Sequence, residues 1–196
     1  VEMTLKYFNS HKDGEFLWNA KPRFGKTLAA YDLCKRMKAK NILIVTNRPA
    51  IANSWYSDYE TFLGTESGLY FVSNVDGIKD KKYVYSRSEY VYKVSKEDND
   101  DRGCIQFVSL QDLKGSIYFG GQYDKLMEVS DTRDEKGNYK GILWDILIID
   151  EAHEGVDTYK TDIAFDHIRR SHTLHLSGTP FKALANDKFP QDAIYN

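Results

Sequence analysis

The nearly continuous apolar run over residues 142–149 constrains the fold of this 196-residue chain more than any other stretch. Asp145 alone interrupts it. A strand that is apolar on both faces is typical of the middle of a parallel sheet covered by helices on both sides. Shorter strand-like runs occur at 16–18, 41–46, 70–73, 104–109 and 172–176. The sequence therefore predicts an α/β fold with a mostly parallel sheet and helices on both of its faces.

Two acidic residues, Asp150 and Glu151, follow the apolar run directly. Open α/β sheets bind ligands beyond the carboxyl ends of their strands. Neighbouring side chains on an extended segment diverge, so the two carboxylates can take two roles. We expect Asp150 to face Mg²⁺, partly through water, and Glu151 to orient and deprotonate an attacking water. An acidic turn exposed to solvent is the alternative for an Asp-Glu pair alone, but Ala152 and His153 complete the run D-E-A-H.

A second segment has the composition of a phosphate-binding loop. It lies between the apolar run that ends at Asn19 and a helical pattern over 28–37. A strand, a tight loop and a helix N-terminus point backbone N–H groups and the positive end of the helix dipole at an anion. The ammonium of Lys26 can then reach the β- and γ-phosphates of a nucleoside triphosphate, and the Thr27 hydroxyl can bind Mg²⁺. The predicted ATP-binding residues are Ala20, Lys21, Pro22, Arg23, Phe24, Gly25, Lys26 and Thr27.

This loop departs from the pattern G-x-x-x-x-G-K-[ST] at two positions. Ala20 stands where the first glycine is usual, and Arg23 occupies an inner position that is often glycine. A residue with a Cβ at that inner position is strained if the backbone needs a positive φ. We therefore expect a functional loop of a different shape, in which Arg23 adds a charge near the phosphates. The alternative is a chance occurrence of G-K-T before a helix.

The chain resembles the first RecA-like motor domain of the superfamily 2 helicases and translocases, of the DEAD/DEAH-box type. The resemblance rests on A-K-P-R-F-G-K-T at 20–27, D-E-A-H at 150–153 and L-S-G-T-P at 176–180. Phe181, directly after the last motif, makes the motor subunits of restriction enzymes the nearest branch. The resemblance implies a P-loop NTPase that uses ATP and Mg²⁺. It also implies that His153, Ser177 and Thr179 couple hydrolysis to movement along nucleic acid.

The same resemblance implies residues that contact nucleic acid. Thr46, Asn47 and Arg48 follow the strand-like run 41–46, and Arg48 has the forked donor that suits a phosphate. Ser109 and Gln111 follow the run 104–109 in the same way. The alternative for both segments is an ordinary turn between a strand and a helix. The first of these helices is expected over about 50–63, with Pro49 in its first turn.

Composition is that of a soluble globular protein, with 41% hydrophobic and 29% charged residues. The net charge of −2 does not favour a dedicated DNA-binding domain, but a motor needs only a local basic strip. Lys79, Lys81 and Lys82 are either such a strip or a solvated loop. Cys34 and Cys104 lack metal-ligand spacing and are expected to be reduced core residues. With no membrane span or secretory segment, the sequence predicts a cytoplasmic protein.

We expect one domain over residues 1–196 with insertions at 74–103 and 130–141. In the first insertion, the segments 83–85 and 90–92 alternate like strands and are expected to pair as a small hairpin. Its tyrosines are expected to pack the hairpin, although stacking on unpaired bases is the alternative. An amphipathic helix is expected near 160–170. The second insertion is expected to be a surface loop.

Features of a complete motor are missing from this sequence. It starts at Val1, has no second RecA-like lobe, and has no glutamine before Gln106 to read adenine. We expect a fragment of a larger protein, which hydrolyses ATP weakly until a second lobe adds positive charge to the transition state. The leading hypothesis is a lobe of a DNA-dependent ATPase from a restriction or other DNA-processing enzyme, with nuclease or methyltransferase domains elsewhere. The alternatives are an RNA helicase lobe and a non-motor P-loop nucleotide-binding module.

Overall fold

The fold is known from a computed structural model of the chain. The described residues are 1–19, 25–46, 51–86, 89–90, 92–93, 102–110, 136, 143–150, 165, 168–177 and 189–195. Most of the strand and helix positions expected from the sequence fall within these ranges. The second insertion falls outside them except for residue 136. Of the expected helix near 160–170, only residues 165 and 168–170 are described; Phe165 is helical, and Arg170 already begins a strand.

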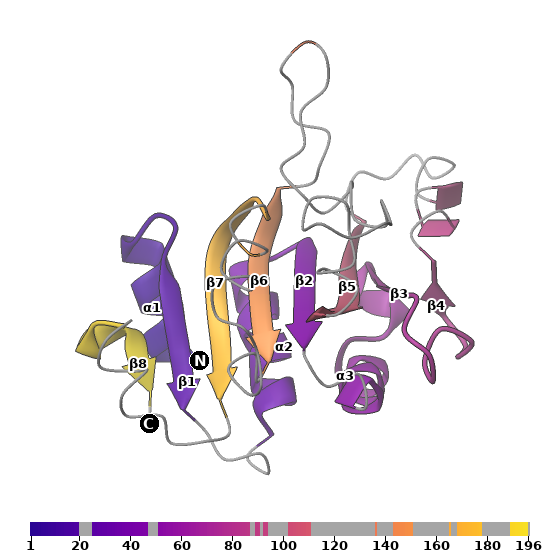
Figure 1. The fold of residues 1–196 in the computed structure, drawn as a ribbon, viewed down its shortest axis with the longest axis horizontal. Helices are drawn as coiled ribbons and strands as arrows, with labels where there is room; N and C mark the ends of the chain where they lie inside the picture. The colour runs from indigo at the N-terminus through magenta and orange to yellow at the C-terminus, as the bar shows by residue number, and fades with distance from the viewer. Residues whose placement is uncertain are drawn as a thin grey trace.

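The described strands form one eight-stranded sheet with the order β4-β3-β5-β2-β6-β7-β1-β8, and every pairing in it is parallel (Figure 1). The strands are β1 Glu15–Asn19, β2 Asn41–Thr46, β3 Leu69–Ser73, β4 Val84–Tyr85, β5 Gly103–Ser109, β6 Trp144–Asp150, β7 Arg170–Ser177 and β8 Ile194–Tyr195. The apolar run 142–149 becomes β6, between β2 and β7. The predicted α/β fold with a parallel sheet is confirmed.

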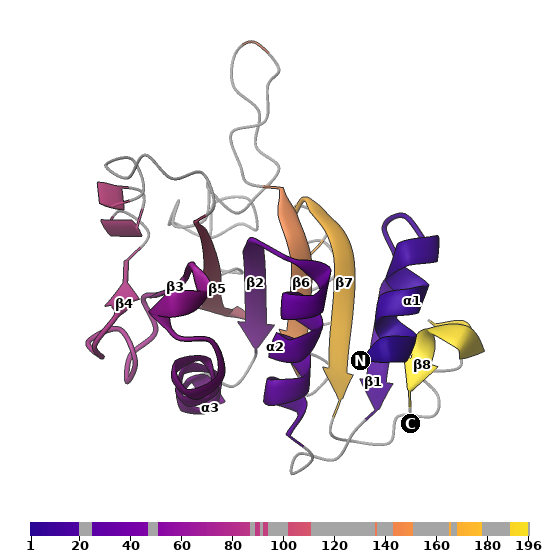
Figure 2. The same ribbon diagram turned by 180° about the vertical axis from the view of Figure 1, so that it is seen from behind.

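Three α-helices lie on one side of this sheet, as Figure 2 shows. They are α1 Glu2–Ser10, α2 Lys26–Met37 and α3 Ala52–Asp58. The chain continues from α3 into a π-helical turn, Tyr59–Leu63, and a short 3-10 turn, Thr65–Ser67. A second 3-10 turn, Gln191–Ala193, precedes β8. The helix expected over 50–63 is therefore present as α3 and its π-helical extension, while Pro49 lies outside the described residues.

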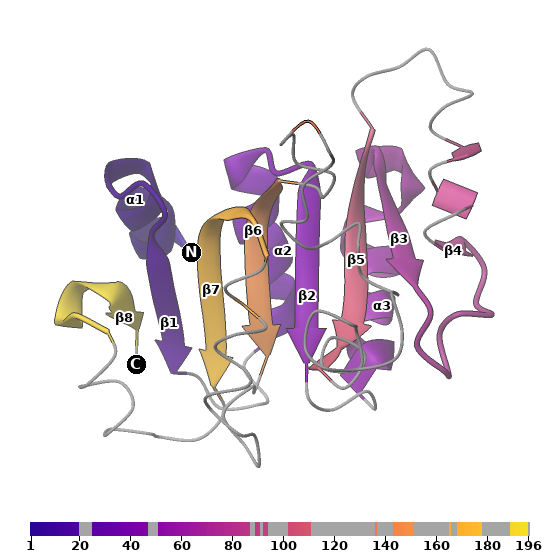
Figure 3. The ribbon, with the colours of Figure 1, turned by 45° about the horizontal axis from the view of Figure 1, so that its top comes forward.

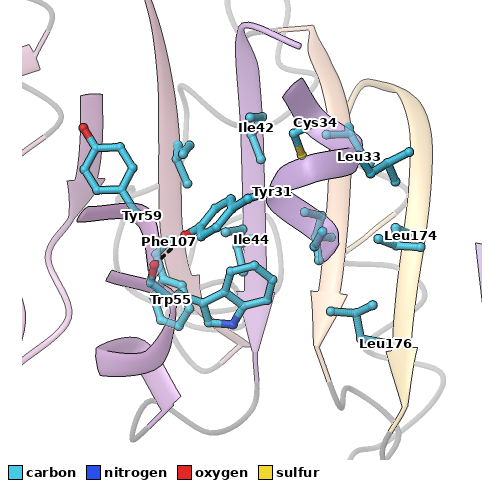
Figure 4. Packing of buried hydrophobic residues seen from close by; sticks show 14 of the residues in the cluster. Tyr31, Leu33, Cys34, Ile42, Ile44, Trp55, Tyr59, Phe107, Leu174 and Leu176 are labelled. Carbon is cyan, nitrogen blue, oxygen red and sulfur yellow. Dashed lines mark hydrogen bonds between the residues drawn. The ribbon is translucent and has the colours of Figure 1, made fainter. Parts of the chain in front are cut away.

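The core has two layers, one on each face of the sheet. Successive side chains of β6 point into alternate layers. Ile148 packs in the layer under the helices, and Leu147 packs in the opposite layer. In the first layer, Leu33 of α2 and Trp55 of α3 pack over the strands (Figure 4). In the second layer, Phe165 and Ile168 cover the strands. Burial on both faces is the reason that the central strands have nearly continuous apolar sequences.

The predicted hairpin in the first insertion is wrong. Val84 and Tyr85 form β4, which pairs in parallel with β3, and the described residues 89–90 and 92–93 are helical. The alternating pattern has another cause, since the rings of Tyr85 and Tyr90 both pack against Tyr70 of β3, with centroids 5.5 and 6.1 Å away. These two tyrosines do pack, as expected, but on the face of the main sheet. The assignment of 74–103 and 130–141 as insertions stays a prediction.

Candidate functional site

The carboxyl ends of the central strands bring several predicted residues into one row. Thr46 of β2 is in register with Asp150 of β6 on one side and with Ser109 of β5 on the other. Residues in register on parallel strands point to the same face, which here is the helix-covered one. All three side chains are buried. The predicted nucleotide-site and nucleic-acid segments therefore meet at one edge of the sheet, where the arrowheads of Figure 3 lie.

The N-terminus of α2 lies at the same edge. Gly25 caps the helix in the left-handed conformation, with φ 62° and ψ 34°. Glycine is favoured there by the backbone angle, because an added Cβ would meet no atom of the described residues within 4 Å. The helix starts at Lys26, and its first amides have no acceptor four residues earlier within the helix. This geometry fits an anion at the start of α2.

Lys26 and Asp150 bring the two sequence motifs together. Nζ of Lys26 lies 2.9 Å from Oδ1 of Asp150, across 124 positions of sequence. The side chain of Asp150 is only 1% exposed and that of Lys26 only 11%. Burying both charges is costly unless they are paired, so this contact is a strongly specified feature of the fold. The predicted proximity of the phosphate loop and the acidic motif is confirmed at this pair.

A residue that the sequence analysis missed contacts the second carboxylate oxygen of Asp150. The indole Nε1–H of Trp55, in α3, donates a hydrogen bond to Oδ2 of Asp150 at 3.0 Å. Trp55 is almost fully buried. Trp55 lies within the helix expected over about 50–63, where a buried aromatic residue is typical of the core. No sequence signal separates such a tryptophan from its apolar neighbours, because the contact spans 95 positions.

Tyr31 links the two helices that reach Asp150. Its hydroxyl donates a hydrogen bond of 2.6 Å to the backbone oxygen of Trp55, and the two rings pack edge to face with centroids 5.3 Å apart (Figure 4). Burial raises the pKa of Tyr31 well above its ordinary value, and so the hydroxyl stays protonated as a donor. Burial also raises the pKa of the neighbouring Cys34 thiol to about 12. Cys34 and Cys104 are both buried and are not joined by a disulfide, as expected.

Comparison with known proteins identifies the family. Residues 2–182 match the family described as type III restriction enzyme, res subunit. The chain belongs to this family. It is a helicase-like RecA-type motor lobe, as the three sequence motifs suggested. The family assignment extends over the phosphate loop, D-E-A-H and the motif at 176–180.

Two known proteins show how far the likeness extends. A Mycoplasma pneumoniae protein, provisionally named as the C-terminus of a type II restriction enzyme and methyltransferase, is 23% identical over 228 residues. The match covers 96% of this chain and 28% of that protein. The SWI2/SNF2 ATPase core domain of Sulfolobus solfataricus superposes with a TM-score of 0.54 at 14% identity, over 94% of this chain and 31% of that one. The structural match supports the RecA-like fold, and the chain spans under a third of each protein.

The described residues of this family member fit a magnesium-bound nucleoside triphosphate. Lys26 supplies a cation, the start of α2 supplies amides, and Thr27 and Asp150 supply oxygen ligands of the kind Mg²⁺ prefers. Among the described residues, no group of three His, Cys, Asp or Glu side chains is arranged to hold a metal. Phosphate and water oxygens commonly supply several of the ligands of Mg²⁺ in nucleotide sites.

Several predicted site residues lie outside the described ranges. They are Ala20, Lys21, Pro22, Arg23, Phe24, Asn47, Arg48, Gln111, Glu151, His153 and Thr179. Ser177 ends β7, where its backbone is in register with Asn19 at the end of β1. Within the described residues, no helix combines the length and apolar character needed to cross a membrane.

Proposed function

We propose that this chain is the ATP-binding motor lobe of a DNA-dependent ATPase that acts as a helicase or translocase in a restriction or other DNA-processing enzyme. The observation that carries the proposal is the 2.9 Å contact between Nζ of Lys26 and Oδ1 of Asp150. It brings the cation of the phosphate loop to the carboxylate of the acidic motif. The name of the Mycoplasma relative supports the restriction context, and nuclease or methyltransferase domains would lie elsewhere in the parent protein.

In this proposal, each residue of the site has one task. Lys26 and the amides at the start of α2 bind the β- and γ-phosphates, and the rest of the loop, Ala20 to Gly25, is proposed to contribute to the same ATP site. Thr27 and Asp150 hold Mg²⁺, which neutralises developing charge on the phosphate oxygens. Glu151 orients the attacking water and accepts its proton. A second RecA-like lobe adds cationic side chains, so the isolated lobe hydrolyses ATP weakly.

Nucleic acid is proposed to cross the same edge of the sheet. The side chains of Thr46 and Ser109 are buried, so their role is to position the segments that follow them. Asn47, Arg48 and Gln111 are the residues that would reach the phosphate backbone. His153, Ser177 and Thr179 would transmit the nucleotide state to movement along the strand. Cys34 and Cys104 are buried thiols outside any disulfide, which suits a reducing compartment and supports a cytoplasmic location.

The test is the ATPase activity of the complete parent protein with duplex DNA, with RNA, and without nucleic acid. We expect stimulation by duplex DNA and little stimulation by RNA. Glu151→Gln should abolish the stimulated rate while ATP binding persists, because only the base for water is lost. Glu66→Gln, at an exposed glutamate, is the matched control and should leave the rate unchanged.

Two outcomes would contradict the proposal. Stimulation by RNA instead of DNA would make the chain an RNA helicase lobe. An ATPase rate that is independent of any nucleic acid would favour a non-motor P-loop nucleotide-binding module. A normal stimulated rate in Glu151→Gln would refute the assignment of Glu151 as the base.

A further inference from the structure

We propose that Trp55 is the positioning residue for the metal-binding carboxylate of Asp150. The inference rests on the proposed function, because it assigns a role within the ATP and Mg²⁺ site. Trp55 would touch neither the nucleotide nor the metal. It acts by holding Asp150 in the orientation in which one carboxylate oxygen remains available to the metal.

The two oxygens of Asp150 have different partners. Oδ1 accepts from Nζ of Lys26 at 2.9 Å, and Oδ2 accepts from Nε1 of Trp55 at 3.0 Å. Lys26 is a charged group on a flexible stem, whereas Trp55 is a neutral donor on a rigid ring with no acceptor atom. A neutral donor fixes the direction of a carboxylate and leaves its negative charge for a cation. Hydrogen bonds of this kind to metal ligands tune metal affinity in many proteins.

Of the two contacts of Asp150, the one from Trp55 is expected to persist when a nucleotide binds, and the one from Lys26 is not. Lys26 is proposed to bind the phosphates, so its ammonium leaves Oδ1 of Asp150. The bond from Trp55 involves the other oxygen and does not compete with that movement. Oδ1 would then be released for Mg²⁺, while the bond from the indole to Oδ2 would be unaffected.

Trp55 is itself held in place by α2. The Tyr31 hydroxyl donates to the Trp55 backbone oxygen at 2.6 Å, and the Tyr31 ring packs edge to face on the indole. Both side chains are almost fully buried, which leaves the indole little freedom to turn. The helix that begins at the phosphate loop therefore also supports the donor to Asp150. The carboxylate is positioned from two helices that are bonded to each other.

The chain offers a matched control in Trp144. It is fully buried and lies in β6, the same strand as Asp150. Nε1 of Trp144 is buried and has no hydrogen-bond partner among the described residues. Replacing either tryptophan with phenylalanine removes a buried indole, but only Trp55→Phe removes a bond to the carboxylate. The comparison therefore separates lost packing from lost positioning.

The experiment measures ATP binding to the purified 196-residue chain by calorimetry, once with Mg²⁺ and once with ATP and EDTA. Trp55→Phe should weaken binding of Mg·ATP about tenfold or more, the range seen when partners of metal ligands are removed. Its affinity for ATP in EDTA should match that of the unchanged chain. Trp144→Phe should bind as the unchanged chain does under both conditions. Circular dichroism establishes that each variant is folded.

A second substitution removes only the donor. Trp55→benzothienylalanine places a sulfur where the ring N–H stands and nearly keeps the size of the indole, so it should show the same loss as Trp55→Phe. In an Asp150→Asn background, Trp55→Phe should have no Mg²⁺-specific effect, because the carboxylate that it positions is absent.

The results that would overturn the inference are distinct from those that would overturn the proposed function. Three results would each overturn the positioning role alone. Trp55→Phe could lose as much affinity for ATP in EDTA as for Mg·ATP, or Trp144→Phe could lose as much affinity for Mg·ATP as Trp55→Phe does. The third result is full affinity for Mg·ATP in Trp55→benzothienylalanine. Failure of the unchanged chain to bind Mg·ATP would overturn the proposed function and this inference together.

Discussion

Two ion pairs at opposite ends of the same sheet differ in burial and geometry. At the carboxyl end, Lys26 and Asp150 are 2.9 Å apart and 11% and 1% exposed. At the amino end, Arg170 at the start of β7 lies 3.6 Å from Glu15 at the start of β1, and these side chains are 18% and 40% exposed. His175 approaches the same Glu15 carboxylate at 3.6 Å. A cavity of about 400 Å³ opens beside this second pair.

The two pairs differ in how much their burial costs. Water screens the pair at the amino end, and such pairs contribute about 0–1 kcal/mol to stability. The pair at the carboxyl end pays a large desolvation cost, which its attraction only partly offsets. Because the Lys26–Asp150 pair adds little net stability, its presence is better explained by a role of both groups in binding a ligand. This contrast supports placing the nucleotide at the carboxyl end of the sheet.

The largest expected effect on stability comes from Asp150→Ala. The change leaves the Lys26 ammonium without its carboxylate and the Trp55 indole without its acceptor. We expect the free energy of unfolding to fall by about 3 kcal/mol, as when one partner of a buried pair is removed. Urea denaturation measures it. A loss below about 0.5 kcal/mol would show that the two ion pairs are equivalent, contrary to the comparison.

A smaller effect is expected from Tyr31→Phe, which removes the hydroxyl that tethers α3. The Trp55 carbonyl also accepts the backbone N–H of Tyr59, so it keeps one partner. We therefore expect a loss of about 1 kcal/mol in the free energy of unfolding. Tyr83→Phe, at a tyrosine that is 46% exposed, should change nothing measurable. Equal losses in both variants would argue against a tether at Tyr31.

The sequence predicted the sheet and the meeting of the two motifs because both depend on simple patterns. Apolar runs such as 142–149 identify strands buried on both faces, and parallel strands bring their carboxyl ends to one edge. It did not predict Trp55, since a donor to a distant carboxylate looks like any other buried aromatic residue. The hairpin prediction was wrong because alternation at 83–85 is the same whether a strand pairs with its neighbour in sequence or with β3.

At the amino end of the sheet, Glu15→Gln should have little effect. It removes the negative charge that faces Arg170 and His175, but the Glu15 side chain is 40% exposed, and Arg170 keeps its hydrogen bonds to the Thr173 hydroxyl and to the backbone oxygen of Ile168. We expect a change of about 0.5 kcal/mol or less in the free energy of unfolding, and a smaller one in high salt. A loss as large as that of Asp150→Ala would contradict the contrast between the two ends.

The smallest expected effect concerns pH. Burial lowers the pKa of His172, which stacks on Phe8, while Asp13 and Asp145 raise it in part. The folded chain then binds fewer protons than the unfolded chain as the pH falls through the ordinary value of 6.5. Stability should decrease from about pH 7.5 to about pH 5.5, and His172→Phe should reduce this dependence. The free energy of unfolding is measured by urea denaturation across this pH range. If it depended on pH equally in His172→Phe and in the unchanged chain, the prediction would be contradicted.

The most direct test of the central claim is Mg·ATP binding by the chain and by its Lys26→Ala variant, measured by calorimetry. Lys12→Ala, at an exposed lysine, is the matched control. If the edge formed by α2 and β6 holds the triphosphate, the unchanged chain and Lys12→Ala bind Mg·ATP saturably and Lys26→Ala shows no binding. Equal affinity in Lys26→Ala and the unchanged chain would contradict the account.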